Sequence, residues 1–162
     1  MSPAPEPAPW GRLADEAPEL AGAVQARLTA TKHHVLATLR QDGSPRVSGT
    51  EVQLRGPELT IGSMPNAVKA RDLQRDGRFA LHSATFDPDD NWPGEAKLAG
   101  VAHEIVDAAR VSEVNGEAAA GGPSHLFRLE LTEASVVSVE DQKYLVVDVW
   151  TEAGGVRQLK RT

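Results

Sequence analysis

The chain contains a series of short strand-like segments separated by tight turns, and this pattern constrains its fold more than any other feature. Asp42-Gly43 joins two such segments, and an Asp-Gly pair is a strong signal for a hairpin turn. Gly56-Pro57 and Gly154-Gly155 indicate further turns of this kind. Strands are expected at residues 33–40, 45–55, 58–63, 78–84, 96–107, 125–140 and 143–161. Because short turns join most of them, the sequence predicts a mainly β (α+β) fold, with an antiparallel barrel of about six to seven strands.

Two or three peripheral helices are expected beside this sheet. Leucine and valine recur at i, i+4 and i+8 in residues 16–30, which indicates an amphipathic helix there. A second helix is expected at 67–76, with Asn66 as its N-cap, because asparagine is a favoured N-cap residue. A short, weak helix is expected at 108–119. Polar or flexible connections are expected at 86–95 and 118–123.

The length and composition fit a single folded domain with a short tail. The 162 residues are 40% hydrophobic and 25% charged, which is typical of a globular domain that can bury a real core. Prolines alternate with other residues near the start of the chain, which is typical of a disordered segment. We therefore expect a disordered Pro-rich tail over residues 1–12 and one domain over 13–162.

Charge and cysteine content exclude several classes of function. The net charge of −6 and the pI near 5.3 argue against a nucleic-acid-binding protein with a broad basic face. The chain has no cysteine, so it has no disulfide and no thiolate nucleophile. No apolar run approaches the roughly 18–20 residues that span a bilayer, and no signal-peptide pattern is present. We expect a cytoplasmic protein that binds neither nucleic acid nor membrane.

The common catalytic and metal-binding motifs are absent from the sequence. It contains no dinucleotide-binding G-x-G-x-x-G, no phosphate-binding P-loop and no G-x-S-x-G nucleophile motif. The five histidines lack metal-ligand spacing, so no metal site is expected. No catalytic residue is assigned either. Such a sequence fits a cofactor enzyme, in which the cofactor performs the chemistry and the protein binds and orients it.

The helix expected at 67–76 raises a question of charge. This acidic chain concentrates basic residues there, and Lys69 falls in the first helical turn. A lysine in the first turn faces the positive end of the helix macrodipole, which is unfavourable. A bound anion would reverse the sign of this interaction and would satisfy the free N–H groups of the turn. A surface lysine that pairs with Asp72 at i+3 is the alternative explanation.

The segments "VLATLRQDGSPRVSGTEV" and "SMPNAVKARDLQRDGRFAL" resemble the pyridoxamine-phosphate-oxidase-like family of split β-barrel flavoproteins. The resemblance runs from about residue 33 to residue 84, and the last strands resemble the family less closely. It implies a split barrel, a homodimer and two FMN sites at the subunit interface. The cofactor phosphate is then the candidate anion at Lys69. A large branch of the family uses a deazaflavin coenzyme instead of FMN.

The resemblance also implies which residues bind the cofactor. Segments 47–50 and 61–64 would run beside the ring system and ribityl chain, and two residues near the C-terminus would come from the partner subunit. Two departures weaken the phosphate site, because Ser48 and Val68 stand where the family has basic residues. The implied cofactor-binding residues are Val47, Ser48, Gly49, Thr50, Ile61, Gly62, Ser63, Met64, Lys69, Trp150 and Arg161.

The substrate end departs further from the family pattern. Arg157 retains a substrate-binding position, whereas Gln53 replaces a lysine and Leu159 replaces a histidine. The resemblance therefore favours an FMN-dependent oxidoreductase that transfers a hydride between the cofactor and a small organic substrate or a nicotinamide nucleotide, without forming pyridoxal phosphate. The alternatives are a deazaflavin-dependent reductase, with Arg71 and Arg75 near the longer acidic tail of that coenzyme, or a non-enzymatic flavin-binding, haem-binding or cofactor-free barrel.

Overall fold

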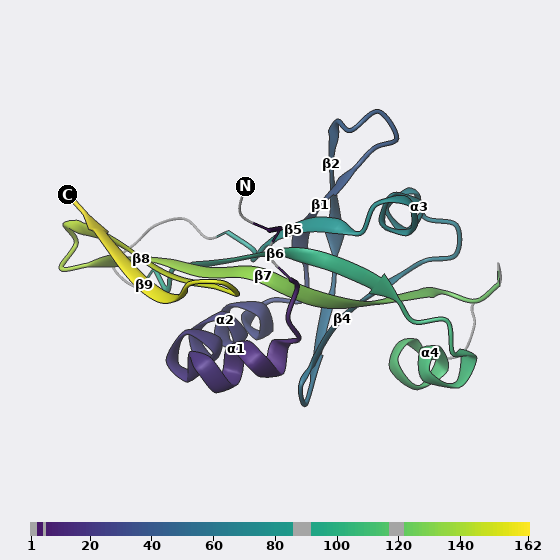
Figure 1. Ribbon diagram of the computed structural model, residues 1–162, viewed down its shortest axis with the longest axis horizontal. Helices are drawn as coiled ribbons and strands as arrows, with labels where there is room; N and C mark the ends of the chain where they lie inside the picture. The colour runs from purple at the N-terminus through teal and green to yellow at the C-terminus, as the bar shows by residue number, and fades with distance from the viewer. Residues whose placement is uncertain (1–2, 5, 86–91, 117–121) are drawn as a thin grey trace.

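The computed structural model describes residues 3–4, 6–85, 92–116 and 122–162, and within them it forms one antiparallel sheet with four helices (Figure 1). The strands follow the order β2-β1-β5-β6-β7-β4-β3, and β8 pairs with β7 and β9. The predicted mainly β, antiparallel fold is confirmed, with nine strands in place of six to seven. Their bounds are β1 His34–Leu39, β2 Pro45–Thr50, β3 Val52–Arg55, β4 Glu58–Ser63, β5 Arg78–His82, β6 Glu95–Glu104, β7 His125–Glu140, β8 Tyr144–Thr151 and β9 Gly155–Arg161.

Part of the difference in strand number arises at Glu51. The sequence predicts one strand over 45–55, but β2 ends at Thr50 and pairs with β1, whereas β3 begins at Val52 and pairs with β4. Glu51 lies between the two ladders and is exposed. The chain thus passes here from one part of the sheet to another, which leaves an opening beside Glu51.

The long strand β7 organises the rest of the sheet. It pairs with β4 and β6 through its first half and with β6 and β8 through its second half. The register between β6 and β7 shifts at Gly100, where a Cβ atom would lie only 1.8 Å from the carbonyl oxygen of Glu130. Only glycine permits this close approach of two backbones, so Gly100 allows β6 to bend across β7.

The four helices are α1 Trp10–Glu16, α2 Pro18–Ala30, α3 Val68–Arg75 and α4 Ala108–Asn115. Helices α1 and α2 pack together beside β6 and β7 (Figure 1). Val24 and Leu28 of α2 are buried in the main hydrophobic core together with Leu129 and Leu131 of β7. Helices α3 and α4 lie at the end of the sheet away from the β8–β9 hairpin (Figure 1). No helix in the described ranges is long and apolar enough to cross a membrane.

The N-terminal segment joins the fold earlier than the sequence predicts. The expected disordered tail reaches residue 12, but Ala8 forms a β-bridge with Leu131, and α1 begins at Trp10. Trp10 and Leu13 are buried, since their i, i+3 spacing turns both side chains toward the core. In the sequence, the prolines that precede Trp10 indicate disorder, so this short apolar stripe was not recognised as a helix. The described residues from Ala8 onward therefore belong to the domain.

The other predicted helices are confirmed with changes at their ends. Asn66 is not the N-cap of α3: Ala67 holds that position without a side-chain hydrogen bond, and Asn66 has a φ of 58°. Helix α4 begins where expected and is capped by Asp107, whose carboxylate accepts a hydrogen bond from the Arg110 N–H. The connections predicted at 86–95 and 118–123 fall largely outside the described residues.

Candidate functional site

A cleft of about 600 Å³ opens where the chain passes from β2 to β3. Strand β4, the loop after it, the first turn of α3 and the end of α4 form its other walls. Six of the predicted cofactor-binding residues line it: Gly49, Thr50, Gly62, Ser63, Met64 and Lys69. The structure therefore brings together residues from β2, β4 and α3 that are far apart in the sequence.

Three predicted residues of the same strands lie outside the cleft lining. Side chains alternate between the two faces of a strand, and this places Val47 on the outer face of β2, where it is 70% exposed. Ile61 points into the hydrophobic core. Ser48 is half-buried, and its Oγ is buried without a hydrogen-bond partner. The predicted contact between the Ile61 side chain and a cofactor is therefore wrong, because core residues enclose this side chain.

The predicted C-terminal residues are also separate from this cleft. Arg157 and Arg161 lie on β9, at the end of the sheet away from α3 (Figure 1), and both are exposed. Trp150 is fully buried, and its indole N–H donates a hydrogen bond of 2.8 Å to the Glu16 carboxylate. The predicted contact between Trp150 and a cofactor in the partner subunit is therefore wrong for the side chain, because the indole has no exposed surface to offer.

Lys69 reaches across the cleft from α3 to β2. Its Nζ donates a hydrogen bond of 2.7 Å to the carbonyl oxygen of Gly49. Burial lowers the pKa of Lys69, and the attraction of Glu51 opposes this shift. The alternative explanation, a surface lysine paired with Asp72, is wrong, because other residues occupy the Asp72 carboxylate. Lys69 is thus a partly desolvated cation on the wall of the cleft.

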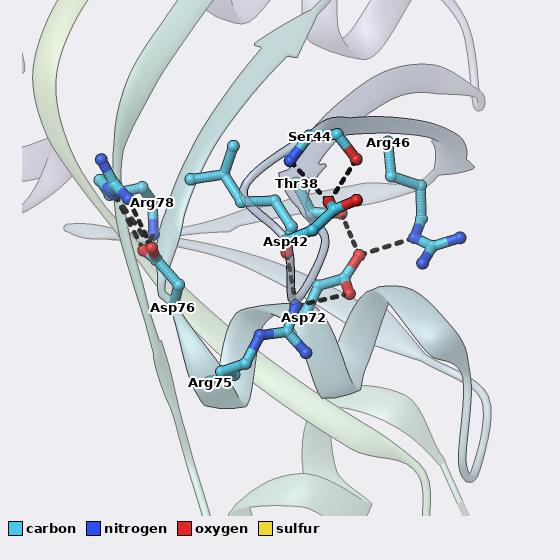
Figure 2. Close-up of polar contacts among 9 residues, drawn as sticks. Thr38, Asp42, Ser44, Arg46, Asp72, Arg75, Asp76 and Arg78 are labelled. Carbon is cyan, nitrogen blue, oxygen red and sulfur yellow. Dashed lines mark hydrogen bonds and ion pairs between the residues drawn. The ribbon is translucent and has the colours of Figure 1, made fainter.

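The Asp72 carboxylate fixes the helix that carries Lys69. It accepts hydrogen bonds from Thr38 at 2.8 Å, Arg46 at 2.7 Å and Arg75 at 3.0 Å, and the two arginines approach it from opposite sides (Figure 2). Burial alone would raise the pKa of Asp72, but these hydrogen bonds together lower it. Arg75 also donates to the carbonyl oxygen of Leu39. The network joins α3 to β1 and β2 and so sets the position of Lys69.

A second residue of the cleft lining carries a hydroxyl without a hydrogen-bond partner. Ser63 is 8% exposed, lines the cleft, and its Oγ has no hydrogen-bond partner in the described part of the chain. A buried polar atom without a partner costs free energy, so such atoms often mark a place where a ligand binds. An ammonium and a hydroxyl among the lining residues of one cleft suit a phosphate group, which accepts hydrogen bonds from both.

Sequence reasoning missed several residues of the cleft. Glu51 and His33 lie at its mouth with 3.8 Å between Nδ1 of His33 and Oε1 of Glu51. Asn115 approaches Gly62 so closely that a Cβ on Gly62 would lie 2.8 Å from Oδ1 of Asn115. Only the glycine in β4 signals these contacts in the sequence, because the break at Glu51 is a change of strand partner that the alternation of 45–55 does not mark. Among the described residues, no group of three or more possible metal ligands is found.

Comparison with known proteins agrees with this geometry at the level of the fold. No protein-family model and no curated protein sequence matches the chain. Among solved structures, PhzG from Burkholderia lata 383, in complex with tetrahydrophenazine-1-carboxylic acid, superimposes with a TM-score of 0.67 at 13% identity, over 95% of this chain and 93% of PhzG. The chain has the fold of the pyridoxamine 5'-phosphate oxidase-like split barrels.

Two further structures show what such split barrels bind. A pyridoxamine 5'-phosphate oxidase-related, FMN-binding protein from Nostoc punctiforme PCC 73102 matches with a TM-score of 0.63 at 13% identity, over 94% of this chain and 99% of that protein. A haem-binding protein from Mycobacterium smegmatis matches with a TM-score of 0.52 at 17% identity, over 85% of this chain and 86% of that protein. The split-barrel fold thus occurs in FMN-binding and haem-binding proteins.

Proposed function

We propose that the cleft binds FMN and that the protein is an FMN-dependent oxidoreductase acting on a small organic substrate or a nicotinamide nucleotide. The single observation that carries this proposal is that Lys69 and Ser63, whose Oγ has no hydrogen-bond partner in the described part of the chain, line the same cleft. Bound FMN would supply hydride transfer at its ring system. The similarity to an FMN-binding split barrel supports the same cofactor. The proposal includes a cytoplasmic location.

Different residues of the cleft would bind different parts of this cofactor. Lys69 and Ser63 would bind the phosphate, since an ammonium and a hydroxyl both donate hydrogen bonds to phosphate oxygens. The backbone of 49–50 and 62–64 would border the remainder of the molecule, because these residues line the same cleft. Gly49 has no side chain, and nothing lies within 4 Å of the place where a Cβ would be, so a flat ring can approach its backbone closely. No residue is assigned an acid or base role.

The substrate of this enzyme would not be a vitamin B6 phosphate. Gln53 lines the cleft, but its Nε2 already donates a hydrogen bond of 3.2 Å to the carbonyl oxygen of Val114. Glu51 adds a carboxylate at the cleft mouth. The Glu51 carboxylate would repel an anionic substrate at the cleft mouth, and the described lining offers no lysine or arginine other than Lys69 to bind it. We therefore expect no useful oxidation of pyridoxine phosphate by the protein supplied with FMN.

A homodimer is part of the proposal. The outer face of β1, β2, β5 and β6 presents apolar side chains, among them Val35 at 46% and Val47 at 70% exposure, with Ala37 and Ala80 between them. Contiguous apolar patches of this kind mark interaction surfaces on soluble proteins. A second copy on this face would cover it. Arg157 and Arg161 would then reach a cofactor only in the cleft of the partner, because β9 lies far from the cleft of its own chain.

Titration with flavins tests the proposed cofactor. Purified protein freed of small molecules is mixed with FMN, riboflavin or a deazaflavin coenzyme, and binding is followed by flavin fluorescence at fixed ionic strength. FMN is expected to bind most tightly, because its phosphate meets Lys69 and Ser63. Tightest binding of the deazaflavin coenzyme would favour the reductase alternative, although Arg75 is already held by Asp72 and Leu39. Failure of all three flavins to bind would refute the proposal.

Haem binding is a second candidate function. His33, an exposed imidazole, lines the mouth of the same cleft, and one similar split barrel is a haem-binding protein. An imidazole is a common axial ligand of haem iron. Addition of haemin followed by absorption spectroscopy separates the two candidates. A Soret band that shifts in the wild type but not in His33→Ala would favour haem over flavin.

A further inference from the structure

One residue outside the cleft lining connects three of the cleft walls. The backbone of His125 pairs with Ser63 of β4, and its carbonyl oxygen accepts a hydrogen bond of 2.9 Å from Nδ2 of Asn115 at the end of α4. Its ring nitrogen Nε2 lies 3.3 Å from the backbone nitrogen of Asn66, in the loop between β4 and α3. His125 therefore contacts the strand, the helix end and the loop that together enclose the proposed phosphate site.

The ring of His125 makes its two contacts in one protonation state. The backbone N–H of Asn66 is a donor, so Nε2 of His125 must be the acceptor and carries no proton. Nδ1 lies 2.8 Å from Oε1 of Glu104, a carboxylate that only accepts, so Nδ1 carries the proton. The ring is thus the neutral Nδ1–H tautomer, and this tautomer holds the amide of Asn66.

Protonation of this ring would act on the loop and not on β6. The Nδ1–H···Glu104 hydrogen bond is present in both states, because Nδ1 carries a proton in both. Protonated Nε2 changes from acceptor to donor and then faces the N–H of Asn66, so two donors meet. Glu104 is itself held by a hydrogen bond of 2.9 Å from Nε2 of Gln74 in α3. The loop residue, with its left-handed φ of 58°, is the partner that must move.

Two polar side chains contact the ring in the described part of the chain. In the described part of the chain, the polar side chains in contact with the ring are Glu104 from β6 and Gln74 from α3, whose Nε2 lies 3.5 Å from Nδ1. Phe127, two residues further along β7, stacks on the ring at 6.4 Å. Of these contacts, only the one with the Asn66 N–H requires an unprotonated Nε2, so protonation of the ring breaks this contact alone.

We propose that His125 is a positioning residue that holds the 64–67 loop in its ligand-binding conformation while its ring is neutral, and that it releases the loop when the ring is protonated. Met64, Pro65 and Ala67 of this loop line the cleft, and Lys69 follows in the first turn of α3. Release of Asn66 loosens this wall, so the affinity for the cofactor falls as the pH decreases. This consequence rests on the proposed function, but the coupling of His125 to the loop does not.

The coupling is tested without any ligand by NMR. Long-range ¹H–¹⁵N spectra at about pH 8 should show the Nδ1–H tautomer of His125, and the amide resonance of Asn66 should shift with the midpoint of the His125 titration. In His125→Gln, whose side-chain oxygen can accept from Asn66, the Asn66 amide should not respond to pH over the same range. An Asn66 amide that is insensitive to pH in the wild type overturns the proposal.

The consequence for the cofactor is tested by FMN titrations across the same pH range. The FMN phosphate also titrates, so the informative quantity is the difference between wild type and His125→Gln. The wild type should lose about tenfold more affinity than His125→Gln between about pH 8 and about pH 5.5. His125→Phe, which lacks the acceptor, should bind weakly at both pH values. His103→Gln is the matched control, because His103 pairs with Glu130 at 3.0 Å away from the cleft.

The outcomes separate this inference from the proposed function. Equal pH profiles for wild type and His125→Gln overturn the role of His125 in binding, even if FMN binds tightly. If FMN does not bind at any pH while the Asn66 amide still follows His125, the proposed function fails and the positioning of the loop stands. If the pH response disappears in His103→Gln as well, it does not arise from His125 and the inference is wrong.

Discussion

Replacement of Lys69 by methionine should weaken FMN binding strongly and riboflavin binding hardly at all. Methionine keeps most of the unbranched stem but removes the ammonium, so the substitution changes the charge of the side chain more than its shape. Riboflavin lacks only the phosphate of FMN, so the pair of ligands isolates the contact between Lys69 and the phosphate. The comparison forms a double-mutant cycle in which one of the two changes is made in the ligand.

The magnitude follows from the state of Lys69 in the structure. Its ammonium is half-buried and donates to the carbonyl oxygen of Gly49 at 2.7 Å, so it is already oriented into the cleft. A hydrogen bond to a charged partner contributes about 1.5–3 kcal/mol, which corresponds to about 10-fold to 100-fold in affinity. We expect Lys69→Met to lose this factor for FMN and less than about threefold for riboflavin.

Isothermal titration at one salt concentration measures both ligands with wild type, Lys69→Met and Arg71→Met. Arg71 lies on the same helix and is exposed, so its substitution removes an equal charge from α3 without removing a cleft residue. The control should change FMN affinity by less than about threefold. Equal losses for FMN and riboflavin in Lys69→Met would show that the lysine does not contact the phosphate.

Three further predictions concern the stability and assembly of the protein. Burial lowers the pKa of His34, so the folded state favours the neutral ring, and the resulting stability is present above about pH 6.5 and is lost as the pH falls. In urea unfolding, the free energy of unfolding of His34→Gln should therefore decline less toward acid than that of the wild type or His33→Gln. Asp72→Asn should lower the free energy of unfolding by about 3 kcal/mol, because two arginines lose a buried carboxylate, whereas the control Asp76→Asn should lower it by less than about 1 kcal/mol. Similar losses of stability in the two variants would contradict the central role of Asp72. In light scattering, Val47→Glu should convert a dimer to a monomer, whereas Val106→Glu, at another exposed valine, should leave the dimer intact. A monomeric wild type would contradict the proposed dimer.

The sequence predicts the sheet well because its signals are local. Alternating side chains and Asp-Gly or Gly-Gly turns define the strands, and the hairpin at Gly154-Gly155 is confirmed between β8 and β9. Helix α1 was beyond such reasoning, because its burial depends on contacts with distant strands. The change of partner at Glu51 is likewise a tertiary event, since nothing in the alternation of 45–55 marks which ladder each half joins.

The candidate site was predictable where it depends on the same local signals. The glycines of β2 and β4 and the lysine of α3 are visible in the sequence, and the structure gathers them in one cleft. The core position of Trp150 agrees with the apolar pattern of its strand, but its hydrogen bond to Glu16, 134 residues away, was not predictable. The role of His125 was hidden for the same reason, since its partners come from β4, β6, the loop before α3 and the end of α4.

The contacts of α1 also bear on when this chain can complete its folding during synthesis. Arg12 donates to the Glu152 carboxylate at 3.0 Å across a separation of 140 residues, and Glu16 accepts from Trp150. These partners of α1 leave the ribosome only after nearly all of the intervening chain has emerged. Such long-range contacts form slowly, because a large loop must close before they are made. Helix α1 can therefore pack against α2 early in synthesis, whereas its bonds to residues 150 and 152 close only late.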